Sequence, residues 1–156
     1  MIVVVGIGAD GWAGVPESSR TEITACDVLV GGARHLGLVP ETGAERVPWP
    51  SPLLPALDEL FTSRAGRRIG VLASGDPLLA GIGTTLVRRF GAEHVRVLPS
   101  VSSVALARAR LGWSAEDTEV VRTVASDAHT VLRTAGDGRR LLVLSADADT
   151  PSTVAA

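Results

Sequence analysis

The chain has 156 residues, of which 46% are hydrophobic and 21% charged, so it can bury a core and is not a disordered polypeptide. Its formal net charge of −2 argues against nucleic acid as the main partner. All 15 basic residues are arginine, which excludes a P-loop and a Schiff-base enzyme, and the single cysteine, Cys26, excludes an internal disulfide and a cysteine-based metal site.

No part of the sequence is typical of export or of membrane insertion. The N-terminal apolar run, Ile2–Val5, is too short for the core of a signal peptide. No other apolar stretch approaches the length of a transmembrane helix. We therefore expect a cytoplasmic protein that has no membrane partner.

Short apolar runs without polar alternation are typical of buried parallel strands. We predict five such strands: Ile2–Val5, Val28–Val30, the weaker Arg46–Val47, Ile69–Ala73 and Val95–Leu98. Helical segments are predicted between and after them: Pro16–Ala25, Leu53–Arg64, Gly83–Phe90 and Ser102–Leu111. This alternation predicts an open, parallel α/β sheet, whose ligands bind at the carboxyl ends of the strands.

The segment Gly112–Asp117 is predicted to be a hinge between two domains. We assign residues 1–112 to an N-terminal α/β domain and residues 117–156 to a partial C-terminal α/β domain. The predicted elements of the second domain are two strands, a helical segment between them and a final helix: Thr118–Val121, Ala128–Ala135, Leu141–Leu144 and the segment that Pro151 opens. Because one such unit cannot bury two faces of a sheet, we expect this domain to be incomplete.

The first motif, Gly6-Ile7-Gly8-Ala9-Asp10-Gly11, directly follows the first strand and fits the pattern G-x-G-x-x-G. An NAD(P)-binding oxidoreductase is therefore one interpretation. Two details argue against it: the residues Trp12–Val15 lengthen the loop before Pro16, and the acid Asp27 precedes the second strand instead of ending it. A tight glycine turn without a ligand is a further alternative.

Two more loops rich in small residues follow predicted strands. In Ala73-Ser74-Gly75-Asp76-Pro77, Gly75 permits a backbone shape that other residues avoid, and Pro77 biases Asp76 toward an extended conformation. This loop can hold an amino-acid headgroup or a ribose; alternatively, Asp76 caps the next helix. In Pro99-Ser100-Val101-Ser102-Ser103, the hydroxyl groups can bind a ligand or cap the helix that follows.

Together, these three loops resemble the S-adenosylmethionine site of the tetrapyrrole (corrin/porphyrin) methylases. Four further stretches are similar to the precorrin-6Y and cobalt-precorrin-7 branch of that family: Val3–Trp12, Val30–Leu36, Val47–Leu53 and Ala107–Trp113. The resemblance covers essentially the whole chain and implies the two-domain α/β fold of that family. Family members run on well beyond residue 156, so we expect this chain to be cut short at its C-terminus. We expect weak cofactor binding and little or no activity from the 156 residues alone.

The resemblance implies methyl transfer from S-adenosylmethionine to a ring carbon of a precorrin in cobalamin biosynthesis, by a homodimer that releases S-adenosylhomocysteine. It implies cofactor contacts at Ala9, Gly75, Asp76, Leu79, Ser102 and Ser103. No catalytic residue is implied, because Ala9 and Gly32 stand where uroporphyrinogen methylases have a proline and a proton-handling aspartate. A noncatalytic ligand-binding fragment is the alternative to an enzyme of either kind.

Two residues that follow the second strand are candidates for contact with the substrate. Precorrins carry acetate and propionate arms, and we hypothesise that Arg34 binds one of these carboxylates, if it is not simply a solvated arginine. His35 lies beside it and either contacts the substrate or only starts a helix. No metal is expected. Since the leaving group is already a sulfonium, catalysis is expected to consist mostly of positioning.

Overall fold

The computed structural model describes residues 1–123, 128–136 and 138–155. The chain divides into two compact units, Met1–Ser102 and Ser103–Ala156. This division precedes the predicted hinge by about ten residues, so the helix before the hinge falls in the second unit. The domain limits 1–112 and 117–156 stay a prediction.

The first unit is built on a sheet of parallel strands. These are β1 (Ile2–Ile7), β2 (Val28–Gly31), β3 (Glu45–Pro48), β4 (Ile69–Ser74) and β5 (Val95–Leu98). Their order across the sheet is β3-β2-β4-β1-β5, and each neighbouring pair is parallel. Every strand that was predicted from an apolar run is present, so the predicted open, parallel α/β sheet is confirmed.

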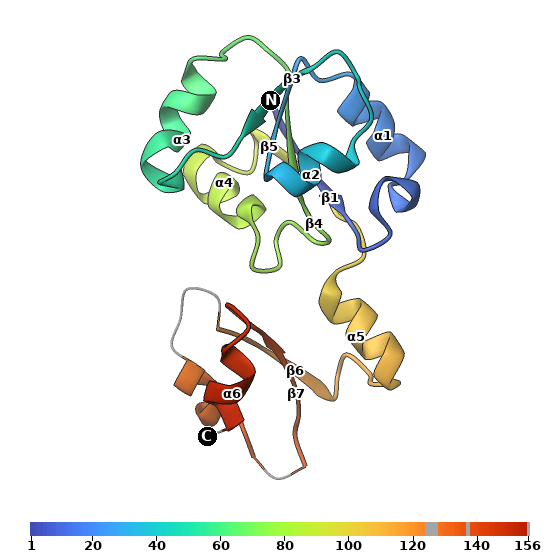
Figure 1. Ribbon diagram of the computed structural model, residues 1–156, viewed down its shortest axis with the longest axis vertical. Coiled ribbons are helices and arrows are strands. Elements are labelled where there is room, and N and C mark those ends of the chain that lie inside the picture. Colours follow the sequence, from blue (N-terminus) through green and yellow to red (C-terminus); the bar gives the residue numbers. More distant parts are fainter. Residues whose placement is uncertain (124–127, 137, 156) are drawn as a thin grey trace. The chain divides into compact units, whose positions relative to one another are not determined.

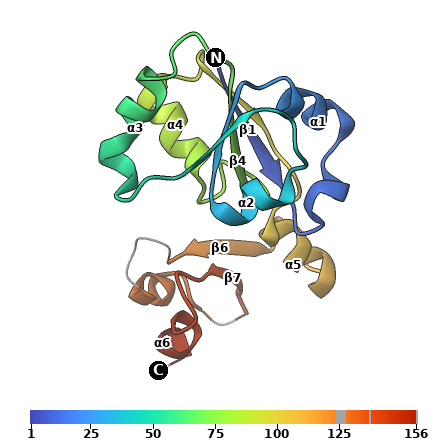
Figure 2. The ribbon, with the colours of Figure 1, turned by 45° about the horizontal axis from the view of Figure 1, so that its top comes forward.

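Helices cover both faces of this sheet. They are the 3-10 helix η1 (Gly11–Gly14) and the α-helices α1 (Glu17–Thr24), α2 (Ala33–Leu38), α3 (Leu53–Thr62) and α4 (Ile82–Phe90). Figure 1 and Figure 2 show α3 and α4 on one side of the strands and α1 on the other. The buried contacts place α2 on the same face as α1. The sequence predicted α1, α3 and α4, left a helix start at His35 of α2 as an alternative, and did not predict η1.

The strand β1, beside the central strand β4, contributes side chains to two separate hydrophobic clusters. Its residues Ile2 and Val4 pack with α3 and α4, whereas Val3 and Val5 pack with α1 and α2. Successive side chains of a strand point to opposite faces of the sheet, and here both faces are covered. This double burial explains why the run is apolar throughout and lacks polar alternation.

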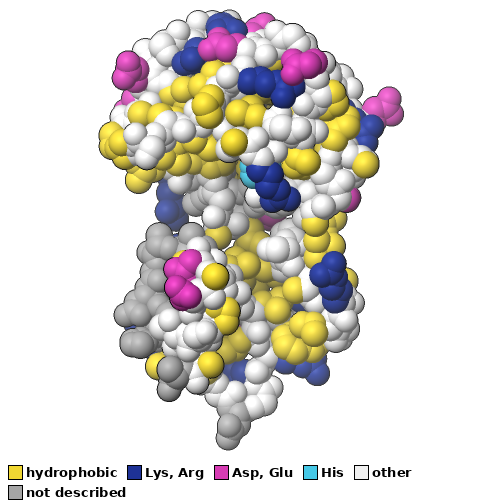
Figure 3. All heavy atoms as spheres, viewed as in Figure 1, with side chains coloured by type: hydrophobic (Ala, Val, Ile, Leu, Met, Phe, Trp, Pro, Cys, Tyr) yellow, Lys and Arg dark blue, Asp and Glu magenta, His cyan; other side chains and the backbone are white. Residues whose placement is uncertain are grey.

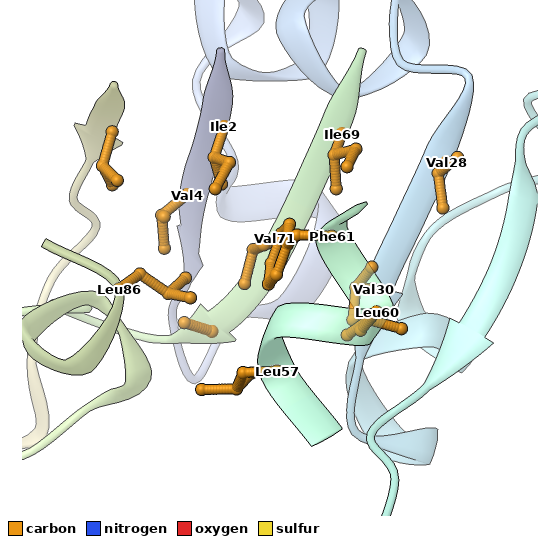
Figure 4. Close-up of a cluster of buried hydrophobic side chains, with 12 residues drawn as sticks. Ile2, Val4, Val28, Val30, Leu57, Leu60, Phe61, Ile69, Val71 and Leu86 are labelled. Carbon is orange, nitrogen blue, oxygen red and sulfur yellow. The ribbon is translucent and has the colours of Figure 1, made fainter. Parts of the chain in front are cut away.

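The apolar stripe predicted for α3 faces the sheet. Leu57, Leu60 and Phe61 are buried, and Leu53 packs against the same cluster. Figure 4 shows the three buried side chains pointing toward the strands. Phe61 also meets Phe90 of α4 edge to face, with 5.1 Å between the ring centroids. The helices α3 and α4 thus share one core with the sheet.

Acidic and basic side chains of the first unit pair with each other. Glu45 accepts hydrogen bonds from Arg67 and, at 2.9 Å, from Arg64, while Glu22 accepts one from Arg96 at 2.8 Å. The two arginines, Arg67 first, hold the pKa of Glu45 below its usual range. On the face drawn in Figure 3, basic and acidic side chains of this unit lie interspersed. Because water screens such exposed pairs, they contribute little to stability.

Two arginines hold the segments that the sequence did not predict as helical. Arg46 donates hydrogen bonds to the carbonyl oxygens of Leu36, at 2.5 Å, and Pro40, at 2.8 Å, and thereby fixes the end of α2. Arg20 donates to the carbonyl oxygen of Trp12 at 3.0 Å, and its guanidinium lies 5.3 Å from the centre of the Trp12 ring. Contacts from residues distant in sequence therefore stabilise α2 and η1.

The second unit contains a smaller parallel sheet. Its elements are α5 (Ser103–Leu111), β6 (Thr118–Arg122), the 3-10 helix η2 (Ala128–Arg133), β7 (Arg140–Leu144) and α6 (Thr150–Ala155). β6 and β7 pair in parallel. The predicted strands and helical segments of this region are confirmed, whereas the incompleteness of the domain stays a prediction. Among the described residues, no helix combines the length and the apolar character that crossing a bilayer requires.

Candidate functional site

The chain leaves the two central strands of the first unit in opposite directions. From β1 it passes through α1 to β2, on the far side of β4, and from β4 it passes through α4 to β5, on the far side of β1. Such a reversal opens a crevice at the carboxyl ends of the two strands, where open α/β sheets bind their ligands. The three loops of the sequence motifs follow β1, β4 and β5 at this edge.

Backbone hydrogen bonds join these three loops. The N–H of Gly75 donates to the carbonyl oxygen of Ile7 at 2.8 Å, and the N–H of Ser100 donates to the carbonyl oxygen of Gly75 at 2.9 Å. Gly6 lies directly beneath this junction, since a Cβ added there would sit 1.8 Å from the Gly75 oxygen. Only a residue without a side chain fits at that position of β1.

Gly75 also touches the loop after β5. Its φ angle is +46°, in the region that favours glycine, and an added Cβ would lie 2.9 Å from the oxygen of Val101 and 3.0 Å from the Cα of Ser102. The two loops that carry Gly75 and Ser102 are therefore in direct contact. Ser103 is the first residue of α5 and belongs to the second unit.

Asp76 shapes its own loop. Its Oδ1 accepts a hydrogen bond from the N–H of Leu78 at 2.9 Å, and its carbonyl oxygen accepts one from the N–H of Leu79 at 3.0 Å. The helix that follows, α4, has Gly81 as its N-cap, with no side-chain hydrogen bond. The alternative in which Asp76 caps that helix is therefore wrong. The carboxylate belongs to a turn at the carboxyl end of β4.

The first loop contains an exposed Ala9 followed by a carboxylate that the sequence did not single out. Asp10 folds back over two glycines: a Cβ on Gly14 would lie 1.7 Å from its Oδ2, and one on Gly8 would lie 2.6 Å from its Oδ1. The spacing of these glycines around one aspartate could have indicated this arrangement. The Asp10 side chain thus occupies the space beside both glycines.

A pocket of about 290 Å³ lies beside these loops, at the carboxyl ends of β2 and β4. Its apolar walls include Trp49, Leu72 and Leu79, and its polar side chains are those of His35 and Ser74. His35 Nε2 lies 3.0 Å from Ser74 Oγ. Burial, and after it the positive charge of Arg34, lower the pKa of His35 below its usual value of 6.5. The ring is therefore neutral at pH 7.

Arg34, the other residue proposed to contact substrate, is exposed at the start of α2. Within the described parts of the chain, it makes no ion pair or hydrogen bond, so its guanidinium is available to a ligand. Trp49 packs against the α3–α4 cluster and lines the pocket as well.

Dinucleotide binding requires an acidic residue at the carboxyl end of the second strand, and Asp27 is not at that end. Asp27 lies at the opposite, amino end of β2, where its Oδ2 accepts a hydrogen bond from the N–H of Arg68 at 2.7 Å. Among residues 1–123, 128–136 and 138–155, no group of three or more potential metal ligands is found. The arrangement suits a ligand that combines an amino-acid headgroup and a ribose, held by backbone groups and one carboxylate.

Comparison with known proteins gives consistent matches. A family model, Tetrapyrrole (Corrin/Porphyrin) Methylases, matches residues 1–156. The precorrin-6Y C(5,15)-methyltransferase (decarboxylating) of Mycobacterium tuberculosis is 51% identical over 99% of this chain and 39% of its own length. The cobalt-precorrin-7 C(5)-methyltransferase of Salmonella typhimurium is 40% identical over 75% of this chain and 58% of its own length. This chain thus spans about two-fifths of the mycobacterial relative's length.

The fold is also similar to a solved structure. The crystal structure of a precorrin-6Y methylase of cobalamin biosynthesis from Archaeoglobus fulgidus superimposes with a TM-score of 0.69 at 28% sequence identity. The match covers 93% of this chain and 73% of that one. The likeness therefore extends over nearly all the elements described above.

Proposed function

The chain belongs to the tetrapyrrole (corrin/porphyrin) methylase family, and from this membership we propose that it binds S-adenosylmethionine and methylates a ring carbon of a precorrin in cobalamin biosynthesis. The observation that carries the proposal is the direct contact of the three loops at the carboxyl ends of β1, β4 and β5. The named activities of the mycobacterial and Salmonella relatives support it.

The residues at the junction suit the methyl donor. Glycine at positions 6 and 75 lets the backbones approach closely, so that N–H and C=O groups line the crevice without side chains in the way. The residues proposed to hold the cofactor are those that the family resemblance implied: Ala9, Gly75, Asp76, Leu79, Ser102 and Ser103. When bound, S-adenosylmethionine supplies a methyl group on a sulfonium, which needs no activation by the protein.

On the substrate side, we propose that the pocket beside His35 takes one edge of the precorrin and that Arg34 binds a carboxylate arm. A guanidinium that has no partner among the described residues can form two parallel hydrogen bonds with a carboxylate. With a volume of about 290 Å³, the pocket lies at the small end for ligand sites, which fits part of a large ring better than the whole.

Three further proposals rest on the family resemblance. They are that the protein acts as a homodimer, that it works in the cytoplasm, and that its domains comprise residues 1–112 and 117–156.

The cofactor class is tested by calorimetry of the complete natural polypeptide. We expect S-adenosylhomocysteine to bind with micromolar affinity and NAD to give no heat of binding, because the acid that would hold its ribose lies at the other end of β2. Saturating S-adenosylhomocysteine should also raise the melting temperature. Binding of NAD, without binding of S-adenosylhomocysteine, would instead favour the oxidoreductase interpretation.

The role of Asp76 is tested by two substitutions that separate the effect of its negative charge from the effect of its hydrogen bond with Leu78. Asp76→Ala removes the carboxylate and the acceptor for Leu78, whereas Asp76→Asn keeps an acceptor oxygen and removes only the charge. We expect Asp76→Ala to weaken S-adenosylhomocysteine binding by about 1.5–3 kcal/mol, as for hydrogen bonds to charged groups. Asp76→Asn should weaken binding less and leave the melting temperature unchanged. Asp58→Asn, on the exposed face of α3, is the control. Unchanged affinity in Asp76→Ala would contradict a cofactor role.

A further inference from the structure

Within the described residues, His35 is the single titratable side chain among those that line the pocket at the carboxyl ends of β2 and β4. The rest of the lining consists of glycine and alanine backbone, one serine and the apolar side chains of Trp49, Leu72, Leu79 and Ile82. A proton released by a ligand in this pocket therefore has His35 as the titratable acceptor among the lining side chains.

The contact of His35 Nε2 with Ser74 orients the imidazole ring. Nε2 lies 3.0 Å from the hydroxyl oxygen of Ser74, across the space between α2 and the end of β4. The other nitrogen, Nδ1, lies on the side of Gly32, where even an added Cβ would remain 3.6 Å away from it. When Nε2–H donates to the serine, the lone pair of Nδ1 is left to accept a proton.

The pocket and the proposed cofactor loop share a segment of chain. Ser74, which holds the imidazole, directly precedes Gly75, and Leu79 is both a wall of the pocket and one of the residues proposed to hold the cofactor. A ligand edge beside His35 therefore lies next to the loop proposed for the methyl donor. This is the arrangement that transfer between two bound molecules requires.

Methyl transfer to a ring carbon that carries hydrogen releases a proton. The S–CH3 bond breaks and its electron pair stays on sulfur, while the ring supplies the pair for the new C–CH3 bond. The C–H bond of the same carbon then breaks, its electrons return to the ring, and H⁺ leaves. One methyl cation enters for each proton lost, so the step needs a proton acceptor and no oxidant.

We propose, on the basis of the methyl transfer proposed above, that His35 Nδ1 accepts this proton and that Ser74 is the positioning residue that holds the imidazole. The accepted proton then passes to solvent when the product leaves. This assigns a general base to a residue that the sequence motifs had not indicated as one.

The charges around the ring favour this role. Arg34 is the charged group that acts on His35, and together with burial it lowers the pKa of the imidazole. Every other lining residue, from the N-cap of α2, β4, the segment after β3 and the start of α4 with the loop before it, is uncharged. The free imidazole is thus ready to accept a proton at neutral pH, and as the pH falls through its pKa it becomes protonated and loses that capacity.

The test compares His35→Gln, Ser74→Ala and the control His94→Gln in the complete natural polypeptide; His94 is 69% exposed at the other end of the sheet. Three quantities are measured: S-adenosylhomocysteine affinity by calorimetry, single-turnover methyl transfer to the precorrin from pH 5 to 9, and the His35 titration midpoint by NMR. In the wild type, we expect the rate to fall in acid with a midpoint that equals the NMR midpoint, below 6.5.

His35→Gln is expected to bind S-adenosylhomocysteine within about twofold of wild type, to lose about 10²–10⁴-fold in rate at pH 7.5, and to lose the acid limb of the pH profile. Ser74→Ala should shift the NMR midpoint and the kinetic midpoint together. His94→Gln should match the wild type.

A rate and profile in His35→Gln like those of the wild type would overturn the proposal while leaving the methyltransferase assignment intact. Absence of both cofactor binding and methyl transfer in the wild type would overturn both. If His35→Gln does not fold, unequal shifts of the two midpoints in Ser74→Ala would overturn the role of His35.

Discussion

Gly6→Ala is expected to abolish measurable S-adenosylhomocysteine binding and to lower the free energy of unfolding by about 3 kcal/mol, the upper end for overpacking a core. The added Cβ would lie 1.8 Å from the carbonyl oxygen of Gly75 and 2.9 Å from the N–H nitrogen of Ser100. Both obstacles are backbone, so no rotamer change relieves the clash. The hydrogen bond that joins the loops after β4 and β5 must then break, and with it the proposed cofactor site loses its shape.

The matched control is Gly37→Ala in α2. No heavy atom lies within 4 Å of a Cβ added there, and the residue is helical. Alanine should stabilise the protein by about 0.4–1 kcal/mol and leave cofactor binding unchanged. Chemical denaturation and calorimetry on both variants provide the comparison. If Gly6→Ala bound the cofactor like wild type, the proposed role of the junction would be wrong.

Leu57→Ala is expected to lower the free energy of unfolding of the first unit by about 2–5 kcal/mol, as for other fully buried leucines. The Leu57 side chain is 0% exposed in the cluster that α3 and α4 share with the sheet (Figure 4). Truncation leaves a cavity beneath the centre of the sheet. The site itself is not touched, so S-adenosylhomocysteine affinity at low temperature should stay near that of wild type.

Leu54, one turn away on α3 and 60% exposed, provides the control for this substitution. Leu54→Ala should change stability by less than about 0.5 kcal/mol. Tryptophan fluorescence reports the first unit alone when Trp113, which lies in the second unit, is replaced by phenylalanine in every variant. Equal losses in the two leucine variants would mean that α3 does not pack on the sheet as described.

The sequence predicted the strands because their signal is local. A short, uninterrupted run of apolar residues such as Ile2–Val5 is typical of a strand that is buried on both faces. β1 nevertheless extends to Ile7, since its last residues pair with Ala73 and Ser74 of β4. That extension depends on a partner strand almost seventy residues away, which no local pattern reveals.

The helix α2 was only an alternative at His35, and its extent was not predicted, for the same reason. It has six residues, among them Gly37, so neither its length nor its composition predicts a helix. Arg46, ten residues from Leu36, holds its end through carbonyl oxygens. A short helix that depends on a distant guanidinium is visible only in three dimensions.

In the candidate site, too, the residue types could be predicted from the local sequence, whereas the contacts between segments far apart in sequence could not. The loops that carry Gly75 and Ser102 were predicted from their residue types, but their direct contact and the clash at Gly6 come from the packing of three strands. The pair of His35 and Ser74 is separated by 39 residues. Sequence reasoning placed His35 near the substrate without the partner that orients it.

The strand order has a consequence for synthesis on the ribosome. β1 is made first, yet both of its neighbours, β4 and β5, are made last. β2 can pair early with β3, but its other edge also waits for β4. At roughly 5–20 residues per second, several seconds pass between the emergence of Ile7 and that of Ser74. During that interval, the most hydrophobic strand of the first unit has no partner, so the nascent chain must be kept from aggregating until β4 arrives and the centre of the sheet can close.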